Sequence, residues 1–224
     1  MSVQATHDAY INRICEELAR EISPNETIKH FANNSEVIGA FAEASVARLV
    51  RRMVEPLRVS TGAVISPQSS QEPSTVPQVD LIIWAPNPLP AICEAGDFAL
   101  VPRNSVFGVI EVKRSNYNSG VGARLKSFVE RDDLTIPVTP RIQVNLASGT
   151  PRLQRSALGI VCLRESNVAD SDLDGLIESG AAVCLIEKGE SGYQVSIAGI
   201  KRLVNFLTDV RSSARDLKDG TWLA

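Results

Sequence analysis

A carboxylate and an ammonium group stand two residues apart at the end of an apolar run. Residues 106–115 read V-F-G-V-I-E-V-K-R-S, a β-branched stretch typical of a buried strand that ends with Glu111 and Lys113. Side chains at positions i and i+2 of a strand share one face and lie roughly 6.6 Å apart. Because an unpaired ion is costly to bury, such a pair normally has partners, and a divalent metal would be one. The pattern therefore indicates a candidate site.

The E-x-K spacing alone is not specific, because Asp216 and Lys218 show the same spacing in a polar stretch near the C-terminus. That second copy is typical of a solvated surface. The first copy follows a buried-type strand, so the context carries the interpretation. Taken alone, Glu111 and Lys113 are equally consistent with a surface ion pair at the end of a strand.

A second carboxylate, Asp80, opens another apolar run, Q-V-D-L-I-I-W-A-P at 78–86, which also predicts a buried strand. If these two strands are sequential antiparallel neighbours, the start of the first lies beside the end of the second. Asp80, Glu111 and Lys113 would then converge at one edge of an apolar sheet. Chance placement at matching strand ends is less common than any one of these residues alone, which favours a site.

A third carboxylate, Glu43, lies on a predicted helix that opens with capping-box spacing between Asn33 and Glu36 and runs to about residue 55. Glu43 has Gly39 and Ala47 one turn away on either side, and small residues let a helix come close to a sheet. Glu43 could therefore be the fourth charge at the same edge. The alternative that remains open is a surface carboxylate paired with Arg48 or Arg51.

The remaining pattern predicts an α/β fold with a central mixed sheet flanked by helices. An amphipathic helix is expected at 4–22, and residues 87–105 are expected to form a long connection. Two buried-type strands separated by an acidic helix predict a parallel crossover. The other expected elements are strands at 57–66, 158–163, 181–187 and 193–197 and helices at 121–131, 172–178 and 200–211.

Composition narrows the class of protein. A chain of 224 residues, 44% of them hydrophobic, can bury one large core. A net charge of −3 argues against binding nucleic acid by bulk electrostatics, yet residues 103–155 hold 9 Lys and Arg against 4 Asp and Glu. The 4 cysteines form no C-x-x-C pair, which excludes an obvious zinc site or disulfide framework. No apolar run is long enough to span a bilayer and no signal peptide is evident, so we expect a cytoplasmic protein without membrane contact.

The predicted organisation is a single compact domain with three parts. These are an N-terminal helical extension packed on the core, the core itself, and a C-terminal edge strand with a helix, at 1–34, 35–190 and 191–224.

The order of these elements and charges resembles the PD-(D/E)xK nuclease superfamily, which has the restriction-endonuclease-like fold. The matching motifs are P-Q-V-D at 77–80, V-I-E-V-K at 109–113 and G-x-x-x-E at 39–43, and the likeness spans roughly residues 35–187. Within that superfamily the motifs look like a group of uncharacterised bacterial nuclease-like proteins. The resemblance implies an αβββαβ core.

The resemblance also implies the chemistry. Asp80, Glu111 and the backbone carbonyl of Val112 would hold Mg²⁺ or Mn²⁺, Glu43 would bind a metal-ligated water or a second ion, and Lys113 would orient the attacking water. The expected activity is metal-dependent phosphodiester hydrolysis in DNA, in defence, restriction or repair. Because cleavage of both strands usually needs two such sites, a homodimer is consistent with this activity.

Phosphate contacts are expected from basic residues near the site. The alternative is a catalytically inactive nuclease-fold protein that acts as a nucleic-acid-binding or assembly subunit. A small-molecule enzyme of another α/β type lacks support, because no P-loop, G-x-G-x-x-G or G-x-S-x-G motif occurs. The predicted phosphate-binding residues are Arg48, Arg51, Arg52, Arg114, Arg124 and Lys126.

Overall fold

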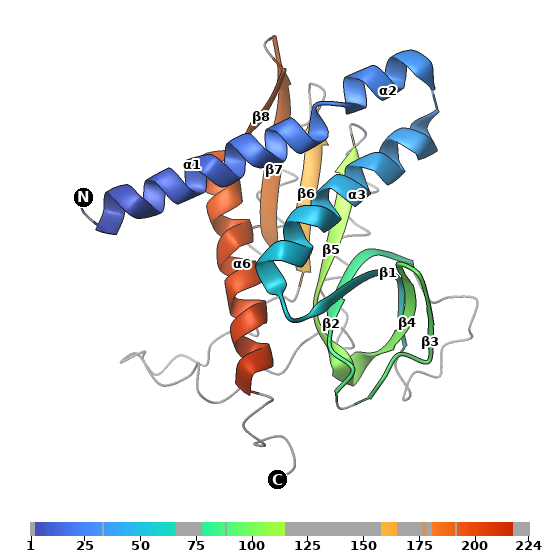
Figure 1. The fold of residues 1–224 in the computed structure, drawn as a ribbon. Coiled ribbons are helices and arrows are strands. Elements are labelled where there is room, and N and C mark those ends of the chain that lie inside the picture. The colour runs from blue at the N-terminus through green and yellow to red at the C-terminus, as the bar shows by residue number, and fades with distance from the viewer. Residues whose placement is uncertain are drawn as a thin grey trace.

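The fold is built on one mixed sheet of 8 strands in the order β3-β4-β1-β2-β5-β6-β7-β8 (Figure 1). The computed structural model describes residues 3–32, 34–65, 78–87, 89–114, 158–164, 177, 181–190 and 192–216. The strands are β1 Arg58–Ile65, β2 Val79–Trp84, β3 Cys93–Ala95, β4 Phe98–Pro102, β5 Val106–Arg114, β6 Leu158–Arg164, β7 Ala182–Gly189 and β8 Gly192–Val195.

Strand pairing follows the prediction at the centre of the sheet. β2 lies antiparallel to both β1 and β5, β6 lies parallel to both β5 and β7, and β8 closes one edge antiparallel to β7. The antiparallel β2 and β5 neighbours and the parallel β6 and β7 pair are therefore confirmed. The fold is the mixed α/β class that the sequence predicts.

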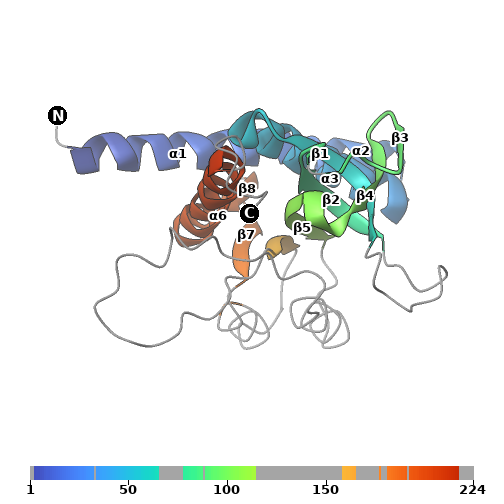
Figure 2. The ribbon, with the colours of Figure 1, turned by 90° about the horizontal axis from the view of Figure 1, so that it is seen from below.

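The described helices are α1 Val3–Ile22, α2 Asn25–Phe31, α3 Ser35–Val54 and α6 Ile197–Asp216. α1, α3 and α6 lie on one face of the sheet, as the view from below shows (Figure 2). Their apolar side chains share one core cluster with Leu81, Ile110 and Val161 of the sheet. Burial of these helical stripes against β-branched side chains stabilises the layered arrangement.

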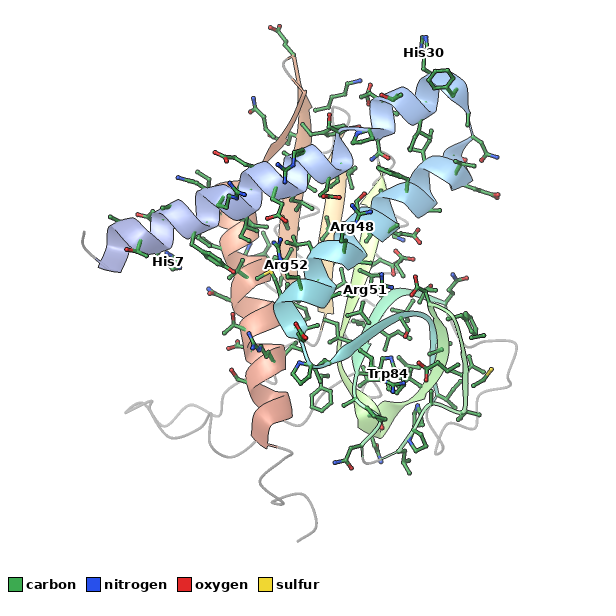
Figure 3. The ribbon with its side chains drawn as sticks, viewed as in Figure 1. His7, His30, Arg48, Arg51, Arg52 and Trp84 are labelled. Carbon is green, nitrogen blue, oxygen red and sulfur yellow. The ribbon has the colours of Figure 1, made fainter. Side chains whose placement is uncertain are left out.

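The opposite face of β1, β2, β4 and β5 buries a second apolar cluster that contains Ile82, Trp84 and Val109. The strands curl around it, with Trp84 inside the curl (Figure 3). Trp84 is 0% exposed and its indole Nε1 donates a hydrogen bond to Ser60 Oγ over 3.1 Å. A buried indole normally needs such an acceptor, so the bond fixes β2 against β1.

Several sequence expectations need correction. The stretch 87–105 is not a simple connection, because it holds the paired strands β3 and β4 and a short 3-10 turn, Arg103–Ser105. β3 is exposed throughout, so no apolar alternation signals it, and β4 has only 5 residues. Helix α2 was also not predicted. The cap of α3 is Asn34 instead of Asn33, because Asn34 Oδ1 accepts the Glu36 amide hydrogen over 2.9 Å.

Other predicted features lie outside the described residues. These are the helix at 121–131, most of the helix at 172–178 and residues 217 and 218 of the second E-x-K copy. The division at residues 34 and 190 stays a prediction. None of the helices described is both long and apolar enough to cross a membrane.

Candidate active site

The C-terminal half of β5 presents the E-x-K pair. Glu111 and Lys113 lie opposite Ile160 and Cys162 of β6, whereas Val112 between them packs into the helix-side core. The side chains of Glu111 and Lys113 are 12% and 18% exposed. The alternation of the strand therefore places both charges together on one face and keeps them mostly out of water.

Asp80 lies in a β-bulge of β2. The β1 residues Ser60 and Gly62 pair with Ile82 and Val79, so Asp80 and Leu81 together oppose a single residue of β1, Thr61. The face alternation breaks at the same point, since Val79 and Leu81 are two residues apart but belong to clusters on opposite faces. A bulge re-aims a side chain that regular pleating would direct into the sheet face.

The same bulge marks the place where β2 and β5 diverge. Their pairing ends at Leu81↔Ile110, although β5 continues beside β6 as far as Arg114↔Leu163. The Asp80 carboxylate reaches across this opening, and its Oδ2 accepts the Val112 amide hydrogen over 2.7 Å. A carboxylate that accepts a backbone hydrogen bond is held in its direction, so Asp80 is aimed at the end of β5.

Lys113 joins the two carboxylates. Its Nζ lies 3.8 Å from Asp80 Oδ2 and makes a closer ion pair with Glu111 Oε1. Asp80 and Glu111 thus point to the same side and share one cation. Their side chains are 16% and 12% exposed, so solvent screens this interaction less than it screens a surface pair.

Glu43 is the fourth member of the cluster. It lies on α3 between the buried Ala42 and Ala47. Burial raises the pKa of Glu43 to about 7, the Asp80 carboxylate adds to the rise and the Lys113 ammonium opposes it. Glu43 of α3 therefore lies within range of the charges of Asp80, Lys113 and Glu111. The structure therefore brings Asp80, Glu111 and Lys113 into direct contact, with Glu43 close enough to experience their charges. The catalytic roles of all four residues stay predictions.

Arg48 and Arg51, the alternative partners expected for Glu43, form ion pairs with other acids in this structure. Arg48 pairs with Glu21 of α1 over 2.5 Å, and Arg51 pairs with Asp97 over 2.8 Å. The surface ion pair that competed with the site interpretation is therefore not the one that forms.

The same ion pairs bear on the predicted phosphate contacts. Arg52 donates to both carboxylate oxygens of Glu17, so Arg48 and Arg52 connect α3 to α1 (Figure 3). Phosphate binding by these arginines and by Arg51 stays a prediction. The side chain of Arg114 and the residues Arg124 and Lys126 lie outside the described part of the chain.

The donor set fits a hard divalent cation. Carboxylate oxygens are the ligands that Mg²⁺ and Mn²⁺ prefer, and Asp80 and Glu111 already hold one cationic group between them. With Glu43 ionised, the cluster has 3 carboxylates against one ammonium, which favours additional positive charge. Within the described ranges, no trio of His, Cys, Asp and Glu side chains is arranged to hold an ion as it stands. Backbone carbonyl and water ligands would have to complete such a site.

The fold is similar to solved structures, although no protein-family model and no curated protein matches the sequence. It is the restriction-endonuclease-like fold. NucC of P. aeruginosa ATCC27853, in its cAAA-bound form, aligns with a TM-score of 0.59 and 13% identity over 95% of this chain and 92% of the other. NucC of E. coli MS115-1, also bound to cAAA, aligns with a TM-score of 0.54 and 15% identity over 96% and 97%. At this identity the likeness concerns the fold alone.

Proposed function

We propose that this protein is a metal-dependent nuclease that hydrolyses phosphodiester bonds in DNA. The observation that carries the proposal is the convergence of Asp80, Glu111, Lys113 and Glu43 where β2 and β5 diverge. A nuclease fold with these groups at a strand opening supports the activity because fold and site point to the same chemistry.

The cation would be held by Asp80, Glu111 and the backbone carbonyl of Val112, with Glu43 holding a water beside it. When bound, Mg²⁺ or Mn²⁺ would supply charge neutralisation at the phosphate and a water that ionises near neutral pH. The Val112 amide fixes the direction of the Asp80 carboxylate, which prepares one ligand in advance.

Lys113 would orient the attacking water and offset negative charge in the transition state. Its ammonium already lies between two carboxylates, which hold Nζ in place without a substrate. A donor that is positioned before the reaction stabilises developing charge without reorganisation. Such a group contributes to the rate instead of to substrate affinity.

A second candidate is a catalytically inactive protein of the same fold that binds nucleic acid. The observation that favours it is the Lys113 ammonium, which pairs with both carboxylates. An ion-paired cluster of this kind can persist as a structural feature without a metal.

The test is plasmid nicking with Mg²⁺ or Mn²⁺ by the wild-type protein and Lys113→Ala. We expect metal-dependent cleavage that falls by roughly 10²- to 10³-fold in kcat in the variant, as for loss of one preorganised donor. The matched control is Lys201→Ala, since Lys201 is also paired with an acid, Asp8 over 3.4 Å, but lies on α6. Its activity should match that of the wild type.

Two results would contradict the nuclease proposal. One is the absence of cleavage of DNA and RNA substrates with either metal, which together with retained binding would support the inactive alternative. The other is equal cleavage by the wild type and Lys113→Ala, which would place the activity at another site or in a contaminant.

A further inference from the structure

The geometry points to Gly62 as a positioning residue for Asp80, a role that depends on the proposed function only for its effect on catalysis. Gly62 pairs with Val79, the residue directly before Asp80, and therefore sits beside the bulge. Gly62 is far from the charged cluster in sequence and carries no chemistry of its own. Its contribution would be to fix the backbone from which Asp80 projects.

A side chain at position 62 would collide with the backbone of β4. A Cβ at position 62 would lie 2.0 Å from the carbonyl oxygen of Ala99 and 2.9 Å from its carbonyl carbon. The contact is to backbone, so no side-chain rotation relieves it. The φ angle of Gly62 is +140°, in a region that favours glycine. Any other residue must shift β1 away from β4 or change its own backbone angles.

Thr61 ties the neighbouring position to the same bulge. Its amide donates to the Asp97 carbonyl over 2.7 Å, and its hydroxyl donates to the Val79 carbonyl over 3.4 Å. β1 is thus held on one side by the β3–β4 turn and on the other side by the start of β2. A shift at Gly62 is transmitted directly to the peptide that carries Asp80.

A displacement of β1 at Gly62 would move Asp80 by more than a catalytic site tolerates. Relieving a 2.0 Å contact requires movement on the order of 1 Å, whereas a productive site tolerates roughly 0.5 Å. A misplacement of about 1 Å can reduce a rate by roughly 10²-fold. Gly62 would therefore determine whether Asp80 reaches the Val112 amide and the Lys113 ammonium, which lie across the opening from β2.

Hydrogen exchange can test the position of the Asp80 carboxylate without an activity measurement. Val112 donates its amide hydrogen to Asp80 Oδ2, so hydrogen exchange at Val112, measured by NMR on metal-free protein, reports that contact. In Gly62→Ala we expect exchange at Val112 to rise by roughly 10-fold, towards the rate in Asp80→Ala, because a hydrogen bond to a charged group is lost. Exchange at Val161 of β6 should stay unchanged.

The matched control is Gly192→Ala. Gly192 has a similar positive φ of +116°, but a Cβ there would meet nothing within 4 Å, and it lies at the far edge of the sheet. The control carries the backbone strain without the contact. Wild-type exchange at Val112 in Gly62→Ala, or an equal rise in Gly192→Ala, would overturn the inference.

A milder variant covers the case in which Gly62→Ala does not fold. Thr61→Val keeps the shape of the side chain and removes the hydroxyl that bonds to the Val79 carbonyl. Faster exchange at Val112 in this variant supports the positioning role, and an unchanged rate contradicts it.

Activity provides a second, separable measurement. Folded Gly62→Ala should nick plasmid with kcat lowered by roughly 10²-fold, and Gly192→Ala should retain wild-type kcat. If the wild-type protein cleaves nothing, the proposed function fails. The exchange measurement still decides the positioning role in that case.

Discussion

Asp80, Glu111 and Lys113 contact one another at the opening between β2 and β5, and Glu43 of α3 experiences their charges. Asp80 and Glu111 both pair with Lys113, whereas the Glu43 carboxylate is repelled by Asp80 and Glu111 and attracted by Lys113. Burial and this repulsion together hold the pKa of Glu43 near 7. Perturbed carboxyl groups of this kind are typical of functional sites because their charge opposes folding and is retained for chemistry.

The raised pKa of Glu43 makes stability depend on pH. Since the folded pKa of about 7 exceeds the ordinary value of 4.5, the contribution of Glu43 to stability is complete below pH 4.5 and is lost as the pH rises through 7. In EDTA, Glu43→Gln should therefore raise the free energy of unfolding relative to wild type more at pH 8 than at pH 4. After allowance for solvent screening, the gain between these pH values should be on the order of 1–2 kcal/mol.

Urea denaturation at both pH values measures this difference. The control is Glu16→Gln, an exposed carboxylate on α1, for which we expect little change between pH 4 and pH 8. An equal effect of Glu43→Gln at both pH values would show that neither burial nor the neighbouring charges raise the pKa of Glu43.

Helix α3 has two tasks that use neighbouring faces. One face carries Glu43 to the site, and the arginines on the adjacent face hold α1 through Glu17 and Glu21. Hydrogen bonding to Arg52 lowers the pKa of Glu17, which agrees with a direct ion pair. A structural partner does not exclude phosphate binding, but it reduces the positive charge that Arg48 and Arg52 offer to a nucleic acid.

A charge swap separates the two tasks of Arg52. Arg52→Glu should lower the free energy of unfolding by roughly 0.5–1 kcal/mol, because it removes an ion pair and brings two acids together. Glu17→Arg combined with Arg52→Glu should recover most of that loss. Chemical denaturation measures the stability, and failure of the double variant to recover would contradict the pairing.

The same double variant then tests the predicted phosphate contact. It keeps the ion pair and the net charge but moves the positive charge from α3 to α1. Fluorescence anisotropy with labelled DNA should show weaker binding if Arg52 contacts phosphate. Unchanged affinity in a fully stable double variant would remove Arg52 from the nucleic-acid interface.

At the scale of the whole molecule, the pairing of β2 with β5 ends at the site, and helix α3 packs across the point where the two strands separate. β1 to β4 curl on one side of the β2 and β5 opening, and β6 to β8 extend on the other (Figure 1). α3 contacts β1, β2 and β5, so it bridges the point of divergence. The opening can therefore exist without separating the two parts of the sheet.

Helix α1 packs in the core that α3, α6 and the sheet share. Leu18 is 0% exposed and lies in the cluster shared by α3, α6 and the sheet. Leu18→Ala should reduce the free energy of unfolding by about 2–5 kcal/mol in a single transition. Tyr10→Ala, on the same helix but 48% exposed, should change it by less than about 0.5 kcal/mol. An unchanged main transition in Leu18→Ala would indicate that α1 folds separately.

The buried elements could be predicted because burial requires a periodic pattern of apolar residues within each segment. The runs at 78–86 and 106–115 are apolar enough to indicate central strands, and the helical stripe around Glu43 includes the small residues that permit close packing. The β3–β4 hairpin was not predicted, because β3 is exposed throughout and has no such periodicity and β4 is only 5 residues long. The sequence signal that could have indicated the hairpin is Gly96, because glycine favours the turn conformation with φ of +61° that the structure shows there.

The residue types and their order along the chain by themselves determined which groups could form a site: Asp80 at a strand start, Glu111 and Lys113 at a strand end, and Glu43 on a helix. Only the tertiary structure decided how they meet. The bulge at Asp80, the divergence of β2 from β5 and the acidic partners of Arg48 and Arg52 depend on contacts between segments distant in sequence. Periodicity reports burial of a segment, but register and pairing are set by the neighbours that share its space.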